Sequence, residues 1–273
     1  MQVSVKDLDP GLLTSMGKYG NVKCVHKFGA APSGIQATPT DVWDRSDAST
    51  TQQIHVAPTQ ARRHQLLSTS DADSDTGGTV AQGAGARTVQ VYGLTAWTST
   101  KESSEVVTMD GTATGGNAVW TTGTYVFVHR IKVITAGATV GGNVGTITAI
   151  AETDGSISAA ILPGNGQTEM AIYAVPSTQS FYLTDWRCNI DKAIGGVASC
   201  DFELRVNSAP DVNLTLFLRK NDIALQSTGV SMFQSHFDIP VKFAGPCIIK
   251  VQGIASANDL DGESSFDGYV IDN

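Results

Sequence analysis

The sequence predicts an all-β protein built of antiparallel strands, and three observations support this fold class. Charged residues make up only 16% of the 273 residues, against about 25% in an average globular domain. Threonine, serine and glycine supply the polar character instead, and threonine and glycine are poor helix formers. Short apolar runs alternate with turn signals at about the 8–12-residue spacing typical of sandwiches and barrels. We therefore expect an antiparallel β-sandwich with a jelly-roll-like or immunoglobulin-like topology.

The distribution of apolar residues divides the chain into three regions. Residues 1–86 hold few periodic apolar runs, which predicts an extended N-terminal arm and an irregular segment. Residues 87–162 form a first β block and residues 163–273 a second, as one large unit or two small ones. The boundary between the blocks rests on Pro163-Gly164-Asn165-Gly166, a run of residues that interrupts strands.

Strands are expected where β-branched and aromatic residues cluster or alternate. The segment 60–67 could be a short helix or a strand. Two Asp-Gly pairs, Asp110-Gly111 and Asp154-Gly155, predict hairpins. The other expected strands are 21–28, 53–57, 88–92, 105–109, 125–134, 146–151, 157–162, 169–175, 181–190, 200–206, 214–219, 232–237, 241–243, 248–254 and 266–271.

The run 200–206 alternates between apolar and charged residues. Successive side chains of a strand point to opposite faces. We therefore expect two faces with different surroundings. Core-facing residues would be Cys200, Phe202, Leu204 and Val206, and solvent-facing residues would be Asp201, Glu203 and Arg205.

The acidic balance of the chain argues against two classes of partner. The net charge is −8 and the isoelectric point is about 5.0. A sequence-independent nucleic-acid binder needs a basic surface, and so does a protein that docks on anionic lipid. The segment 1–12 has no apolar signal-peptide region, and no apolar run approaches the roughly 20 residues of a membrane span. We expect neither a nucleic-acid nor a membrane partner.

No residues are nominated for catalysis, cofactor binding or metal binding. Phosphate-binding loops, nucleophile elbows and zinc-protease signatures are absent from the sequence. The histidines show no i, i+2 or i+4 pairing, and no Cys-x-x-Cys occurs. Strand-like surroundings of Cys188, Cys200 and Cys247 favour buried free thiols over a disulfide.

Two acidic segments contain carboxylates of the kind that bind calcium. Asp71-Ala72-Asp73-Ser74-Asp75 begins like one, but its sixth position is Thr76 and its twelfth is Gln82, where a calcium loop has Gly and Glu. We expect a solvated turn there, and a connection with an Asp-Gly turn at 258–263. Trp97 and Trp120 lie near turn-rich segments and could be exposed, as a carbohydrate-binding platform would require.

Several short motifs resemble a family of structural proteins encoded by tailed phages, many of them marine. The resemblance covers about residues 28–273, and the order and spacing of the motifs carry it. The matching runs are Lys27-Phe28-Gly29, Asp41-Val42-Trp43-Asp44, Gly83-Ala84-Gly85-Ala86-Arg87-Thr88-Val89-Gln90-Val91-Tyr92-Gly93-Leu94, Glu105-Val106-Val107-Thr108-Met109-Asp110-Gly111-Thr112, Asn143-Val144-Gly145-Thr146-Ile147-Thr148, Gly164-Asn165-Gly166-Gln167-Thr168 and the ending Ser265-Phe266-Asp267-Gly268-Tyr269-Val270-Ile271-Asp272-Asn273.

This resemblance implies a non-enzymatic virion component that works in an oligomer, with a trimer among the options. It would assemble in the host cytoplasm with other virion proteins, such as the major capsid protein or neck and tail proteins. A small β body with a long arm and no fibre-like repeat favours a capsid-associated decoration or cement protein. The alternatives are a neck, tail or baseplate component, and a carbohydrate-binding module. The arm would dock on a neighbour by strand addition.

Overall fold

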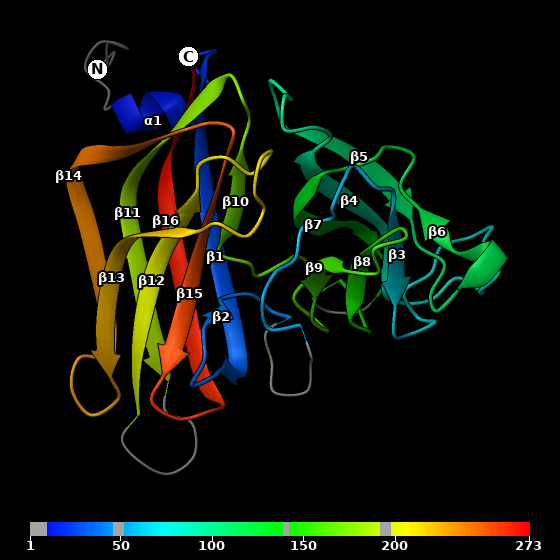
Figure 1. The fold of residues 1–273 in the computed structure, drawn as a ribbon. Coiled ribbons are helices and arrows are strands. Elements are labelled where there is room, and N and C mark those ends of the chain that lie inside the picture. Colours follow the sequence, from blue (N-terminus) through cyan, green and yellow to red (C-terminus); the bar gives the residue numbers. More distant parts are fainter. Residues whose placement is uncertain (1–9, 46–51, 139–141, 192–197) are drawn as a thin grey trace, which may run out of the picture.

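The computed structural model describes residues 10–45, 52–138, 142–191 and 198–273. Strands hold 54% of the chain and helices 3%, and all of the strand pairs within the sheets are antiparallel. The all-β, antiparallel prediction is therefore confirmed. The strands form four sheets, grouped into a larger and a smaller unit (Figure 1).

The larger unit consists of two sheets with long strands. One sheet has the order β1-β16-β11-β14, and the other has the order β10-β15-β12-β13 with β2 paired to β15. A short helix, α1 (Pro10–Ser15), lies at one end of the first sheet (Figure 1). The bounds are β1 Val22–Ile35, β2 Thr40–Asp41, β10 Ile172–Val175, β11 Gln179–Asp191, β12 Ser199–Asn207, β13 Leu218–Gln226, β14 Met232–Ala244, β15 Cys247–Ala255 and β16 Leu260–Asp272.

The smaller unit is built from the chain between β2 and β10. Its sheets have the orders β6-β3-β8-β9 and β5-β4-β7. The bounds are β3 His64–Ser68, β4 Ala86–Leu94, β5 Ser103–Thr108, the 3-10 turn η2 Gly115–Asn117, β6 Val119–Trp120, β7 Phe127–Ala136, β8 Ile147–Ala151 and β9 Ile157–Ile161.

The first long strand, β1, pairs with the last strand, β16. Their register runs from Val22 opposite Ile271 to Ile35 opposite Leu260. The prediction of an extended arm over 1–86 is therefore wrong for the described residues, because β1, β2 and β3 all belong to sheets. The smaller unit is inserted between β2 and β10, so it begins before the predicted first block 87–162.

The strand predicted at 21–28 is the first half of β1, and small residues explain why the prediction stops short of the end of β1 at Ile35. A Cβ built on Gly29 would lie 2.3 Å from the carbonyl oxygen of Val42 and 2.4 Å from the amide nitrogen of Ala171. Two other backbone segments thus lie directly against β1, and only glycine fits between them. Close packing of neighbouring backbone requires small residues in this part of β1. The large apolar side chains from which a strand is predicted are therefore missing there.

The core of the larger unit lies between its two sheets. Phe181, Trp186 and Phe266 from one sheet are fully buried, and so are Phe202 and Val251 from the other. A second cluster joins the units, with members on both sides of the connection. Its large members include Trp43, Phe127, Met170, Ile172 and Ile248.

The predicted side-chain orientations in 200–206 are confirmed for the core-facing residues and wrong for one residue expected to face solvent. Phe202 and Leu204 are buried, but Glu203 is also only 6% exposed. Its carboxylate pairs with Arg205 at 2.5 Å and with Arg219 at 3.2 Å. A buried carboxylate needs such partners, whereas Asp201 on the same face is exposed as predicted.

Most of the expected strands form and one predicted hairpin is confirmed, but four expectations differ from the structure. Asp154-Gly155 closes the hairpin of β8 and β9, with Gly155 at φ 67°. Asp110-Gly111 forms no hairpin, because β5 pairs with β4 and the next strand, β6, belongs to another sheet. The runs 232–237 and 241–243 are one strand, β14, which tolerates Pro240 because it lies at a sheet edge. The run 214–219 is mostly a loop before β13, and 53–57 forms no strand.

Ile35→Ala tests whether β1 belongs to the core. Ile35 is fully buried, and its side chain packs on Gly253 and Gly262 of two other strands. Truncation should lower the free energy of unfolding by about 2–5 kcal/mol, measured by urea denaturation.

The matched control is Cys24→Ser on the same strand. The Cys24 side chain is exposed, so this change should stay within about 0.5 kcal/mol of wild type. Equal stability of Ile35→Ala and wild type would show that β1 lies outside the core.

Candidate functional site

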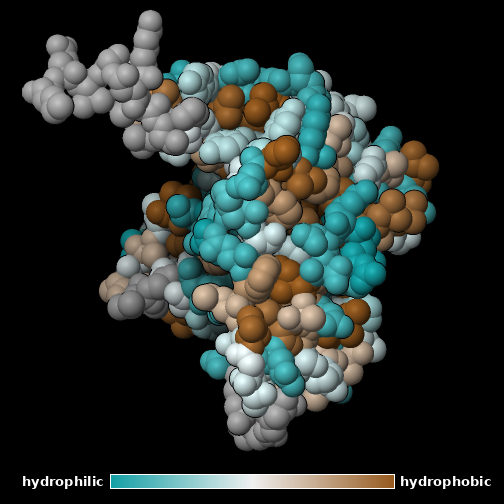
Figure 2. Space-filling view, turned by 90° about the vertical axis from the view of Figure 1, so that its left-hand side faces the viewer, coloured by the Kyte–Doolittle hydropathy of each residue, from teal (hydrophilic) through white to brown (hydrophobic). Residues whose placement is uncertain are grey.

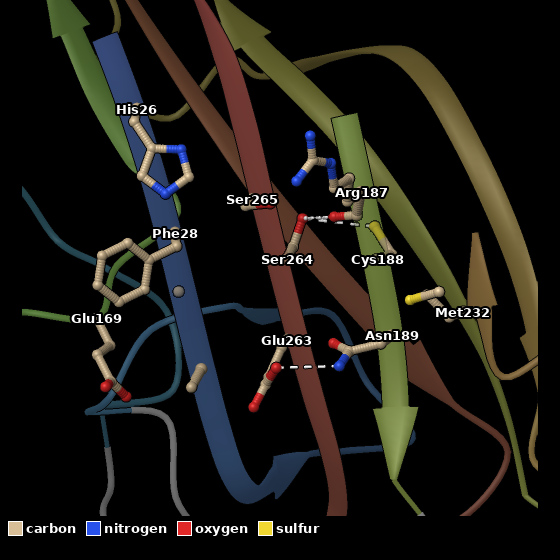
Figure 3. Close-up of a pocket in the computed structure, with 12 residues that line it drawn as sticks. His26, Phe28, Glu169, Arg187, Cys188, Asn189, Met232, Glu263, Ser264 and Ser265 are labelled. Atoms are coloured by element: carbon tan, nitrogen blue, oxygen red, sulfur yellow. Dashed lines mark hydrogen bonds between the residues drawn. The ribbon is translucent and has the colours of Figure 1, made fainter. Parts of the chain in front are cut away.

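A pocket lies on the outer face of the first large sheet (Figure 3). Neighbouring strands bring its side chains together: His26 and Phe28 from β1, Glu263 from β16, and Asn189 from β11. Glu169, just before β10, closes one side, and the cavity volume is about 310 Å³.

Some polar groups of this pocket are hydrogen-bonded to one another. Asn189 donates from Nδ2 to Glu263 Oε2 at 3.0 Å, and the Ser264 hydroxyl donates to the Arg187 carbonyl at 2.9 Å. Burial raises the pKa of the Cys188 thiol, so the thiol is protonated at neutral pH and a poor nucleophile. The geometry thus suits binding on an open face better than covalent chemistry.

Two further cavities lie along β1 on the side facing the smaller unit. One is lined by Lys23, Lys27, Tyr92, Glu102, His129, Arg130 and Tyr173 among others. Inside it, His129 Nε2 lies 3.2 Å from Glu102 Oε2, which also pairs with Lys23 at 3.2 Å. Burial lowers the pKa of His129, so its imidazole is neutral at pH 7 and donates a hydrogen bond from Nε2 to the Glu102 carboxylate.

The buried charge pair Asp41–Lys250 holds β2 and the following segment on the second large sheet. Asp41 is fully buried, and its Oδ1 lies 2.9 Å from Lys250 Nζ. Its Oδ2 accepts a hydrogen bond from the backbone N–H of His55 at 2.7 Å. Because removing one partner would leave an uncompensated buried charge, this pair is structural.

An apolar surface is exposed at the edge strand β14. Met232, Phe233, Ile239 and Val241 are 70%, 47%, 85% and 37% exposed. Leu218 at the start of the neighbouring edge strand β13 is 52% exposed. Figure 2 views this side of the molecule and shows hydrophobic patches separated by hydrophilic strips. We call these five residues the β14 edge surface.

The acidic run 71–75 begins in a turn with Asp71 exposed, as predicted, but the prediction is wrong for its centre. Asp73 is fully buried. Its carboxylate accepts hydrogen bonds from the Ser68 hydroxyl at 2.7 Å and from the backbone N–H groups of Ala86, Val144 and Gly145, each at 2.8 Å. Both oxygens are therefore occupied by donors, and the residue joins loops from three parts of the chain.

Four of the short motifs that carry the family resemblance lie near Asp73, whereas the motifs at 27–29, 41–44 and the chain end lie in the larger unit. Gly85 lies so close that an added Cβ would stand 2.0 Å from Asp73 Oδ1. Gly111 donates its N–H to the Asp73 carbonyl at 2.9 Å, at a φ of 58°. Asn143 accepts from the Gly166 N–H at 2.9 Å and donates to the Gly145 carbonyl at 2.8 Å. These motifs build the loop end of the smaller unit rather than a reactive site.

The cysteines and tryptophans named in the sequence analysis are mostly buried or half-buried. Cys188, Cys200 and Cys247 are buried free thiols, as predicted, whereas Cys24 is free and exposed. Trp97 and Trp120 are half-buried, and the Arg63 guanidinium lies 5.3 Å from the Trp120 ring.

Within the described ranges, no group of three or more His, Cys, Asp or Glu side chains could hold a metal ion. In the same ranges, no helix is long and apolar enough to span a membrane.

Comparison with known proteins adds no assignment. No protein-family model matches the chain, and no curated protein matches it.

Asp73→Ala tests the structural role of the buried carboxylate. The change leaves three backbone N–H groups without an acceptor, and each orphaned donor costs about 1–3 kcal/mol. The free energy of unfolding should fall by more than about 3 kcal/mol, measured by denaturant titration.

Asp75→Ala is the control, because its side-chain hydrogen bonds to Thr76 and Gln82 are exposed. Its effect should stay below about 1 kcal/mol. Wild-type thermal melts in calcium and in chelator should overlap, and a higher Tm in calcium would mean that the carboxylates of this loop hold an ion.

Proposed function

We propose that this chain is a non-enzymatic structural subunit of a tailed-phage virion that packs against neighbouring subunits through the β14 edge surface. The observation that carries the proposal is the exposure of four large apolar side chains on one long edge strand. Asp238, Pro240 and Lys242 on this strand hinder backbone pairing with another chain, so the proposed contact is made by the apolar side chains. Exposed apolar patches of this kind typically mark interaction sites.

We infer further that the larger unit is a jelly roll. Apart from β2, the larger unit has eight strands. In chain order they pair from the outside inward: β1 with β16, β10 with β15, β11 with β14, and β12 with β13. This is the pairing of one long hairpin rolled into two facing sheets, which is how two Greek keys make a jelly roll. Jelly rolls occur widely in viral capsids, and the motif resemblance supports the same assignment.

Within the virion, a capsid decoration or cement role remains our first proposal, ahead of a neck, tail or baseplate role. The original support for it, a long free arm, is weakened because β1 pairs with β16. What supports it now is the combination of a broad β body with an apolar edge. We propose a homo-oligomer, with a trimer among the options, that also contacts other virion proteins.

Ile239→Lys tests the proposed interface. Ile239 is 85% exposed, so the change should alter monomer stability by less than about 0.5 kcal/mol. Sedimentation velocity should show an oligomer for wild type and a shift to monomer for the variant, because a lysine would have to be desolvated in the contact.

Val106→Lys on β5 is the matched control, since Val106 is 55% exposed on the smaller unit. It should leave the oligomer intact. A wild-type protein that stays monomeric at all concentrations and is absent from the proteome of purified virions would contradict the proposal.

A further inference from the structure

A basic pocket lies between β1 and the smaller unit. It is lined by Cys24, His26, Lys27, Phe28, Arg130, Gln167 and Thr168, and its cavity volume is about 340 Å³. No carboxylate lines it. It adjoins the pocket of Figure 3, with which it shares His26 and Phe28.

Two cations face this pocket without a carboxylate bonded to either. Lys27 is only 7% exposed, and its Nζ donates to the His129 carbonyl at 2.6 Å. Arg130 donates from Nη2 to Gln167 Oε1 at 2.6 Å. Among the described residues, the recorded salt bridges include neither side chain. The hydrogen-bond acceptors of both side chains are thus neutral: Glu102 and Asp44 act on Lys27 only through space, and the Arg130 guanidinium lies 5.9 Å from the Tyr92 ring.

A buried hydroxyl adds a third donor. Thr168 is 4% exposed, and its Oγ1 has no hydrogen-bond partner among the described residues. A buried hydroxyl without a partner is costly, and this one belongs to the pocket that also holds the two cations.

The charges around Lys27 explain why an anion would be favourable. Burial and the charge of Arg130 lower the pKa of Lys27 to about 7, while Glu102 and Asp44 act in the opposite direction and Lys23 adds to the lowering. His129, on the strand opposite, is neutral at pH 7. An anion between Lys27 and Arg130 would screen their repulsion and favour the protonated lysine.

We propose that the pocket formed by Lys27, Arg130 and Thr168 is a binding site for a tetrahedral oxyanion, either free phosphate or sulfate or the phosphate of an ester. Arginine and lysine are the usual ligands of such groups, and a guanidinium binds them through two parallel hydrogen bonds. The hydroxyl supplies a neutral donor. This proposal is independent of the virion role, because it rests on a different surface from β14.

Calorimetric titration of the full chain with sulfate tests the site, with sodium chloride at equal ionic strength as reference. Wild type should bind sulfate saturably. Arg130→Gln should weaken binding at least about tenfold, and Thr168→Val about fivefold. Lys132→Gln removes the same charge from the same strand at an exposed position outside the pocket, and it should bind like wild type.

The pH dependence separates this site from a general salt effect. Sulfate keeps its charge between pH 6.5 and 8, whereas Lys27 loses its proton, so affinity should fall about eightfold over this range. Glycerol 3-phosphate binding more tightly than phosphate would identify an ester as the ligand, and equal affinities would identify the free anion. No saturable sulfate binding, or equal weakening by Arg130→Gln and Lys132→Gln, would overturn the proposal.

Discussion

The pairing of β1 with β16 is the constraint on which the rest of the structure depends. It brings the two ends of the described chain into one sheet and places eleven register positions side by side. Because both ends of the described chain are held in this sheet, the smaller unit is an insertion: the chain leaves the larger unit after β2 and re-enters it at β10. Contacts of such large sequence separation form late and are costly in loop-closure entropy. The apolar core between the two large sheets, with Trp186, Phe202 and Phe266, offsets that cost.

Buried polar groups complement this apolar core at the points where segments meet. Asp73 gathers the loops at one end of the smaller unit, Asp41 and Lys250 fasten β2 and its following segment, and Glu203 holds two arginines on the outer face. In each case the buried charge has several donors or an opposite charge, which is the condition for its burial. The pocket of Lys27 and Arg130 differs, because the hydrogen bonds of both cations go to neutral acceptors. That difference is the reason for assigning a ligand there and a structural role elsewhere.

Strands with a two-residue period could be predicted from the sequence, and features set by distant partners could not. The runs around Val89, Phe202 and Val251 show the alternation or apolar density that a buried strand requires. By contrast, β1 uses Gly29 because other backbone segments lie against it, and no local pattern reveals them. The burial of Asp73 depends on Gly145, 72 residues away. Likewise, Lys27 and Arg130 share a pocket only because β1 and β7 meet across the two units.

Hydrogen exchange measured by mass spectrometry tests the pairing of β1 with β16 most directly. As an edge strand, β1 directs about half of its amides toward its partner, so about half of the amides in 22–35 should stay protected. They should remain so after the loop 209–217 has exchanged fully, and they should exchange together with the amides of β16. Exchange of 22–35 as fast as that of the loop, with β16 still protected, would contradict the account and restore a free N-terminal arm.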